Sequence, residues 1–106
     1  MNEMALAARA DLRIDLDAVP IYPETRALCD YFGLDPWGVI ASGSLLLAVE
    51  AAEADRVVAA LQRNRIEAAV IGHVIDKSDQ PIVLAELGEH CEPLRTFERD
   101  EIAKLF

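Results

Sequence analysis

The stretch that decides the fold is PETRALCDYFGLDPWGVIASGSLLLAV, residues 23–49. Its first ten residues predict a helix that begins at Pro23, because proline suits the first helical position, where its missing amide hydrogen leaves no bond unmade. Apolar side chains recur at three- and four-residue spacing here, which places Cys29 on the face that turns toward a core. Gly33 follows as the expected C-terminal stop, since glycine adopts the left-handed conformation without strain.

The second half of the stretch predicts a short helix, a break and a buried strand. Asp35 and Pro36 repeat the start signal, a capping carboxylate followed by proline at the first helical position. The small residues Ser42, Gly43 and Ser44 interrupt this helix. Residues 45–49 are continuously apolar, and we expect them to form a central strand that is covered on both faces.

Upstream of this stretch, the chain predicts one helix and one strand. Residues 2–10 are amphipathic and predict the helix. Residues 12–16 alternate between apolar and charged side chains, which is typical of a strand with one solvent face near the edge of a sheet.

Downstream, residues 53–63 predict the clearest helix, with acidic residues early, basic residues late and Asn64 as its terminator. Residues 68–75 and 82–87 predict two strands of a hairpin. Residues 88–93 are expected to be irregular, and Thr96 to cap a last helix. Two helical crossovers and one hairpin predict an α+β fold, a mixed sheet of about four strands with helices packed against it.

Composition and charge narrow the class of protein. The chain has 10 basic and 19 acidic residues among 106, a formal net charge of −9, which disfavours nucleic acid or an anionic membrane as a partner. Its two cysteines lack the CxxC spacing of metal or redox motifs and are expected to be reduced thiols. No apolar run approaches the ~20 residues of a membrane span, and the N-terminal residues lack a secretory signal. We therefore expect a cytoplasmic protein.

Residues 33–49, GLDPWGVIASGSLLLAV, contain a glycine stop, a capped short helix, a small residue beside glycine and an apolar strand. This series resembles the C-terminal domain of the AIR synthase (PurM-like) superfamily, and within it the HypE family of hydrogenase-maturation proteins. The resemblance continues upstream over residues 1–29, and downstream over residues 53–62 and the segment AAVIGHV, residues 68–74. It covers roughly residues 1–88.

The resemblance implies a PurM C-terminal-domain-like fold, with residues 1–106 as one AIR synthase-related C-terminal domain that lacks the superfamily's N-terminal nucleotide-binding domain. ATP and magnesium are the cofactors that it implies for full-length relatives, whose ligands belong to that absent domain, and it implies no cofactor for this chain alone. HypE-type proteins end in a Pro-Arg-Ile-Cys-like tail whose terminal cysteine is carbamoylated and dehydrated to a thiocyanate. This chain ends in Phe106 and its nearest cysteine is Cys91, so we expect no catalytic residue in the isolated chain.

Five residues are candidates for ligand binding, in two places along the chain: Ser42, Gly43 and Ser44, then Gly72 and His73. The first group precedes a predicted strand, whereas ligands of open α/β sheets bind where strands end, so a simple chain reversal is favoured there. A glycine within a strand indicates a bulge or a close backbone approach, and packing is the favoured role of Gly72. Histidine is a common ligand and proton-transfer group, although an ordinary strand residue is the favoured interpretation of His73.

The adjacent pair His90 and Cys91 offers two further alternatives. Cys91 could be a reactive thiol, but no basic group other than His90 lies near it in sequence. With Cys29 and His73 the pair could supply four zinc ligands, but their spacing lacks the close pairs of structural zinc sites. We therefore predict no metal site.

Three hypotheses for function follow. The first is the C-terminal lobe of a HypE-like protein in NiFe-hydrogenase maturation or a related ATP-dependent process, acting as a binding or interaction module. Its expected partner is a second copy in a homodimer or a nucleotide-binding N-terminal lobe, with no nucleic acid and no membrane. The alternative is a free-standing dimeric domain that binds a small regulatory ligand. An independent enzyme that uses His73, His90 or Cys91 is the weakest hypothesis.

Overall fold

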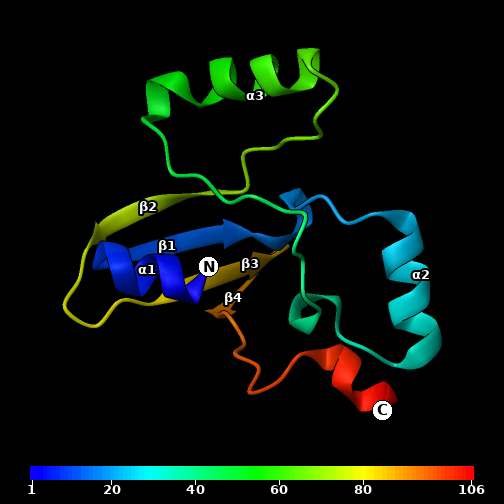
Figure 1. Ribbon diagram of the computed structural model, residues 1–106. Helices are drawn as coiled ribbons and strands as arrows, with labels where there is room; N and C mark the ends of the chain where they lie inside the picture. Colours follow the sequence, from blue (N-terminus) through cyan, green and yellow to red (C-terminus); the bar gives the residue numbers. More distant parts are fainter. The chain divides into compact units, whose positions relative to one another are not determined.

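A four-stranded mixed sheet is the main structural feature of the chain (Figure 1). The computed structural model describes all 106 residues. The sheet has the strand order β2-β1-β3-β4, in which β1 pairs antiparallel with β2 and parallel with β3, and β3 pairs antiparallel with β4. The strands span Gly72–Lys77 (β2), Ala10–Asp15 (β1), Val83–Leu87 (β3) and His90–Pro93 (β4). With the helices α1 (Asn2–Ala8), α2 (Pro23–Phe32) and α3 (Ala54–Arg63), this confirms the α+β prediction.

The chain divides into two compact units. The sheet unit comprises Met1–Pro20 and Leu46–Leu94, and therefore holds α1, α3 and all four strands. The helical unit comprises Ile21–Leu45 and Arg95–Phe106. It contains α2 and two short 3₁₀ helices, η2 (Pro36–Gly38) and η4 (Glu101–Leu105).

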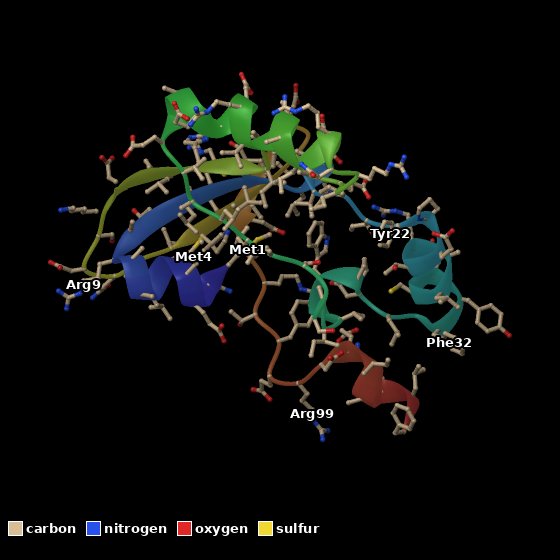
Figure 2. The ribbon with its side chains drawn as sticks, turned by 45° about the horizontal axis from the view of Figure 1, so that its top comes forward. Met1, Met4, Arg9, Tyr22, Phe32 and Arg99 are labelled. Atoms are coloured by element: carbon tan, nitrogen blue, oxygen red, sulfur yellow. The ribbon has the colours of Figure 1, made fainter.

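The core of the sheet unit lies between α1 and one face of the sheet. Because side chains alternate along a strand, the apolar residues of β1 share one face, and they meet those of β3 in register. The buried cluster consists of Ala5 on α1, Leu12 and Ile14 on β1, and Val83 on β3. Met1 and Met4 pack against this cluster (Figure 2).

β1 is a central strand, so the expectation that residues 12–16 lie near an edge is wrong. The strand alternates as predicted, but neighbours flank it on both sides, β2 on one and β3 on the other. Two of its charged residues, Asp11 and Arg13, are therefore partly buried, whereas Asp15 at its end is exposed. Arg13 pairs with Glu86, the Nη1 to Oε1 distance being 3.5 Å. Alternation shows which face meets solvent, but it does not show how many strands lie alongside.

The predicted hairpin between residues 68–75 and 82–87 is also wrong. Both segments contain strands, β2 and β3, but β1 lies between them. The hairpin of the sheet is instead β3 to β4, joined at Gly88 and Glu89, in the segment that was expected to be irregular. The parallel β1–β3 pairing joins residues about 70 positions apart, which no local pattern encodes.

Residues 45–49 do not form the predicted central strand. They make no strand pairing, and Leu45, Leu47 and Val49 are 82%, 54% and 46% exposed. An apolar run indicates a tendency toward burial, but a strand also needs a neighbour that supplies its backbone hydrogen bonds. This segment has no such neighbour in the structure.

Several helix predictions are confirmed. α2 spans the predicted residues and ends at Gly33, whose φ of 65° is the left-handed conformation expected of a C-terminal glycine. α3 ends at Asn64 as predicted. The capped element after Asp35 is shorter than predicted, a single 3₁₀ turn, and the last helix is the 3₁₀ helix η4, capped by Asp100 in place of Thr96.

None of the helices has both the length and the apolar character needed to cross a lipid bilayer.

Candidate functional site

The first candidate group, Ser42, Gly43 and Ser44, forms an exposed turn in the helical unit. The Ser44 amide donates to the Ala41 carbonyl at 2.9 Å, which closes the turn. A β-carbon built on Gly43 would meet no atom within 4 Å, so open space surrounds this backbone. The geometry is that of a chain reversal, the favoured sequence interpretation, and ligand binding here stays a prediction.

The second candidate group lies in the sheet unit, on β2. Gly72 pairs with Ile14 of β1, and a β-carbon on Gly72 would run into the carbonyl oxygen of Arg13. The glycine therefore permits a close backbone approach, one of the two structural roles that a strand glycine indicates. His73 follows it, exposed, and lies opposite Arg13 in the ladder. The two candidate groups belong to different units of the chain.

The sheet face turned away from α1 carries most of the remaining polar side chains of the strands. Arg13 points to this face because its neighbours Leu12 and Ile14 point to the core, and its ladder partner His73 shares the face. On this face Glu86 forms an ion pair with Arg13. Cys91 on β4 is the ladder partner of Glu86. We call these four residues the open-face row. It draws one residue from each strand.

The open-face row does not place His90 beside Cys91, as the reactive-thiol hypothesis would require. His90 and Cys91 are consecutive in an extended strand, so their side chains point to opposite faces of the sheet. Cys91 is exposed, whereas Cys29 is buried in α2. No group of three or more His, Cys, Asp or Glu side chains is arranged to hold a metal ion.

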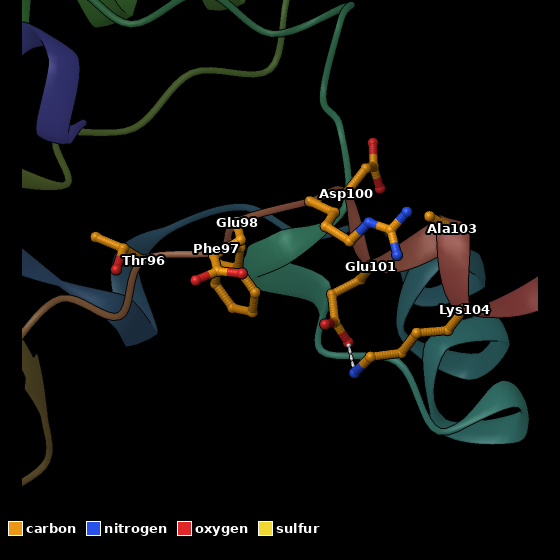
Figure 3. A pocket seen from close by; sticks show the side chains of 8 residues that line it. Thr96, Phe97, Glu98, Asp100, Glu101, Ala103 and Lys104 are labelled. Carbon is orange, nitrogen blue, oxygen red and sulfur yellow. Dashed lines mark hydrogen bonds and ion pairs between the residues drawn. The ribbon is translucent and has the colours of Figure 1, made fainter.

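A second polar cluster, which the sequence did not predict, lies in the helical unit around Asp35. One carboxylate oxygen of Asp35 accepts the Trp37 amide at 3.0 Å and so caps η2, and the other accepts Arg95 Nη1 at 2.7 Å. The Asp35 amide itself donates to Glu101 Oε2 at 3.0 Å. Glu101 also accepts Lys104 Nζ at 2.6 Å (Figure 3).

Glu101 is the one charged residue that is buried, at 6% exposure. Its pKa is held below the usual carboxyl value of 4.5, chiefly by the hydrogen bond from the Asp35 amide and then by that from Lys104. The positive charges of Lys104 and Arg95 act in the same direction, while desolvation opposes them. Both donors bond the same carboxylate oxygen, Oε2. No local pattern signals this cluster, because its partners lie 60 to 66 residues apart.

A shallow hollow of about 320 Å³ lies beside this cluster, and all of its lining comes from the C-terminal segment. Figure 3 shows its lining residues, which are Thr96, Phe97, Glu98, Arg99, Asp100, Glu101, Ala103 and Lys104. The side chains are of mixed charge, and Glu101 and Lys104 already bond each other.

Comparison with known proteins identifies the family. A family model described as the AIR synthase related protein, C-terminal domain, matches residues 1–85. The chain belongs to this family. The match begins at α1 and extends into β3, so it includes both candidate groups and the open-face residues Arg13 and His73.

Curated relatives of this AIR synthase-related domain include carbamoyl dehydratases named HypE. The protein of Rhizobium leguminosarum bv. viciae is 43% identical over 77 residues, 71% of this chain and 22% of the relative. The protein of Rhodobacter capsulatus is 38% identical over 78 residues, 71% of this chain and 23% of the relative. The protein of Escherichia coli K12 is 33% identical over 79 residues, 73% of this chain and 24% of the relative. The chain thus spans about a quarter of the length of these relatives. No solved structure matches it.

The residues of the chain do not fit ATP and magnesium, the cofactors that the resemblance implies for full-length relatives. Mg²⁺ on a nucleotide is usually held by one or two carboxylates together with the phosphates. The carboxylates that do cluster, Asp35, Asp100 and Glu101, are engaged by backbone amides and by Arg95 and Lys104.

Proposed function

We propose that this domain is the C-terminal lobe of a HypE-like protein and works in the maturation of NiFe hydrogenases. The observation that carries the proposal is the family match over residues 1–85 together with 43% identity to a carbamoyl dehydratase HypE. In this role the lobe binds a partner lobe and performs no catalysis alone. The ATP-dependent step of the whole process belongs to a nucleotide-binding lobe.

A binding role is supported by how the reactive side chains are distributed. Cys91 is exposed on the edge strand β4, and the imidazole of His90 points to the other face of the sheet. Glu86, the ladder partner of Cys91, is occupied by Arg13. A nucleophile needs a base within hydrogen-bond reach, and the chain does not place one beside this thiol.

The partner that we propose is a nucleotide-binding N-terminal lobe. A net charge of −9 favours a protein partner over nucleic acid or an anionic membrane, both of which repel an acidic chain. As part of the same proposal, the domain acts in the cytoplasm. The sheet face that carries Arg13, His73, Glu86 and Cys91 is the surface that we propose for this contact.

Calorimetry on the separate lobes tests the proposal. The N-terminal remainder of the Rhizobium relative is produced alone and titrated with this domain, and each protein is also titrated with ATP and magnesium. We expect the domain to bind the N-terminal lobe and to give no heat with ATP. Arg13→Ala, which removes a charge from the open face, should weaken the binding. Arg99→Ala removes the same charge from an exposed residue of the helical unit and is the matched control.

Two outcomes would contradict the proposal. Tight ATP binding by the domain alone would show that it carries its own nucleotide site. A stable homodimer that ignores the N-terminal lobe would favour the alternative, a free-standing dimeric domain that binds a small regulatory ligand.

A further inference from the structure

The C-terminal segment of the helical unit returns to a turn more than fifty residues earlier. Residues 95–104 contact residues 35–40, the turn that contains η2. The turn lies inside the part of the chain that matches the family, residues 1–85, and the segment lies outside it. The contact therefore joins a family element to a segment that the family model does not include.

Two carboxylates of the segment occupy two backbone donors of the turn. Glu101 Oε2 accepts the Asp35 amide at 3.0 Å, and Asp100 Oδ2 accepts the Ile40 amide at 3.1 Å. Hydrogen bonds to a charged acceptor are stronger than those between neutral groups. The other oxygen of Asp100 accepts the Ile102 amide at 3.0 Å, which fixes the start of η4 and so aims both carboxylates.

Packing and ion pairing reinforce these bonds. Gly38 lies directly under the segment, since a β-carbon built on it would come within 2.5 Å of Phe97 and Glu101 side-chain atoms. Arg95 stacks over the Phe97 ring at 5.4 Å and reaches Asp35. The turn is thus covered by a ring and a carboxylate that belong to the same short segment.

We propose that residues 95–104 form a clasp that closes over the turn of residues 35–40, that Glu101 holds it shut, and that it opens as a unit while the sheet stays folded. Closed, the clasp occupies the Asp35 and Ile40 amides and covers Gly38. Opening frees both donors and uncovers Gly38, so the clasp is a reversible cover on this turn. The clasp does not depend on the proposed function.

The charges around Glu101 set the conditions for opening. The groups that face it are the Asp35 amide and carboxylate, Arg95, and on its own segment Asp100 and Lys104. The Asp35 amide, Lys104 and Arg95 lower the pKa of Glu101. Protonation of Glu101 therefore opens the clasp only below the usual carboxyl pKa of 4.5. At neutral pH the clasp is closed, and removing the charge of Glu101 by substitution is the direct way to open it.

The test uses the full chain and the variant Glu101→Gln at neutral pH. We expect the Asp35 and Ile40 amides to exchange with solvent about tenfold faster or more, because a charge-assisted bond is replaced by a weaker one. Trypsin should cut after Arg95 and Arg99 at a correspondingly higher rate. Glu98→Gln is the matched control, because it removes the same charge from an exposed residue of the segment. It should change neither readout.

A second variant opens the clasp without a charge change. Gly38→Ala places a methyl group against Phe97 and Glu101 and should raise the same two rates. If neither Glu101→Gln nor Gly38→Ala speeds exchange at residues 35 and 40, the clasp does not exist. If the amides of β1 lose protection together with those of the turn, the segment belongs to one cooperative fold and the inference is overturned.

Discussion

A close backbone approach at Gly72 makes this residue a sensitive point of the sheet. A β-carbon there would collide with the Arg13 carbonyl oxygen and lie 3.0 Å from the Ile14 Cα, both on the backbone of the central strand β1. Backbone atoms cannot rotate away, so the strands must separate. We expect Gly72→Ala to lower the free energy of unfolding by about 1–3 kcal/mol, measured by urea denaturation.

Gly43→Ala is the control for that substitution. Its β-carbon would meet no atom within 4 Å, and the residue lies in an exposed turn. The free energy of unfolding should stay within about 0.5 kcal/mol of the parent value. Equal effects of the two substitutions would show that β1 and β2 do not approach as described.

Glu101 makes the stability of the chain pH-dependent. Its pKa in the folded state lies below the usual value of 4.5, chiefly because the Asp35 amide and Lys104 donate to it. The folded state therefore binds the proton more weakly than the unfolded state. The stability from this carboxylate is fully present above pH 4.5 and is lost as the pH falls through the folded-state pKa.

Denaturation of the parent and of Glu101→Gln across this pH range measures the effect. The parent should be more stable above pH 4.5, and the difference should shrink as the pH falls below it. Glu98→Gln should show no such pH-dependent difference. A difference between parent and Glu101→Gln that is constant with pH would mean that the carboxylate charge has no part in it.

At the scale of elements, the packing of α1 against the sheet depends on a small residue, Ala5. Ala5 is 1% exposed and contacts the cluster of Leu12, Ile14 and Val83. Ala5→Leu would add bulk to a filled contact and lift the helix, at a cost of about 1–3 kcal/mol in the free energy of unfolding. Ala7→Leu makes the same change on an exposed position of α1 and should be neutral. If urea denaturation finds both variants equally stable, α1 does not cover the sheet through Ala5.

Elements with local signals were predictable from the sequence, and those that depend on distant partners were not. Pro23 and Gly33 mark both ends of α2, and both are where the structure places them. Residues 45–49 had only hydrophobicity to indicate a strand, and no partner for them exists. β4 was missed because it ends in Pro93, which is tolerated at the end of an edge strand but breaks a strand pattern.

The candidate sites follow the same division. The close approach at Gly72 was predictable, because a glycine inside a strand commonly marks a bulge or a place where another backbone comes near. The contacts of Glu101 were not, because Asp35 lies 66 residues away and nothing near Glu101 in sequence indicates burial. A buried carboxylate becomes visible only when the structure brings its donors together.

At the scale of the whole molecule, the two units differ in how many apolar side chains they bury. The buried apolar residues of the sheet unit are Ala5, Ala10, Leu12, Ile14, Val83 and Ala85, whereas the helical unit buries only Cys29 among its apolar side chains. Burial of apolar surface is the main source of stability, so local openings should occur where it is least. The helical unit should therefore open at a lower free energy than the sheet unit.

Native-state hydrogen exchange in low denaturant tests this with two reporter amides. Leu12 donates to Ile82 at 3.0 Å in the sheet unit, and Leu34 donates to Cys29 at 2.8 Å in the helical unit. We expect Leu34 to exchange through a smaller opening with a weaker denaturant dependence, while Leu12 exchanges only on global unfolding. Leu12→Ala should then lower the protection of residue 12 by about 2–5 kcal/mol and leave Leu34 unchanged. A single free energy and a single denaturant slope for both amides would show one cooperative unit, because the helical unit would then open only when the sheet does.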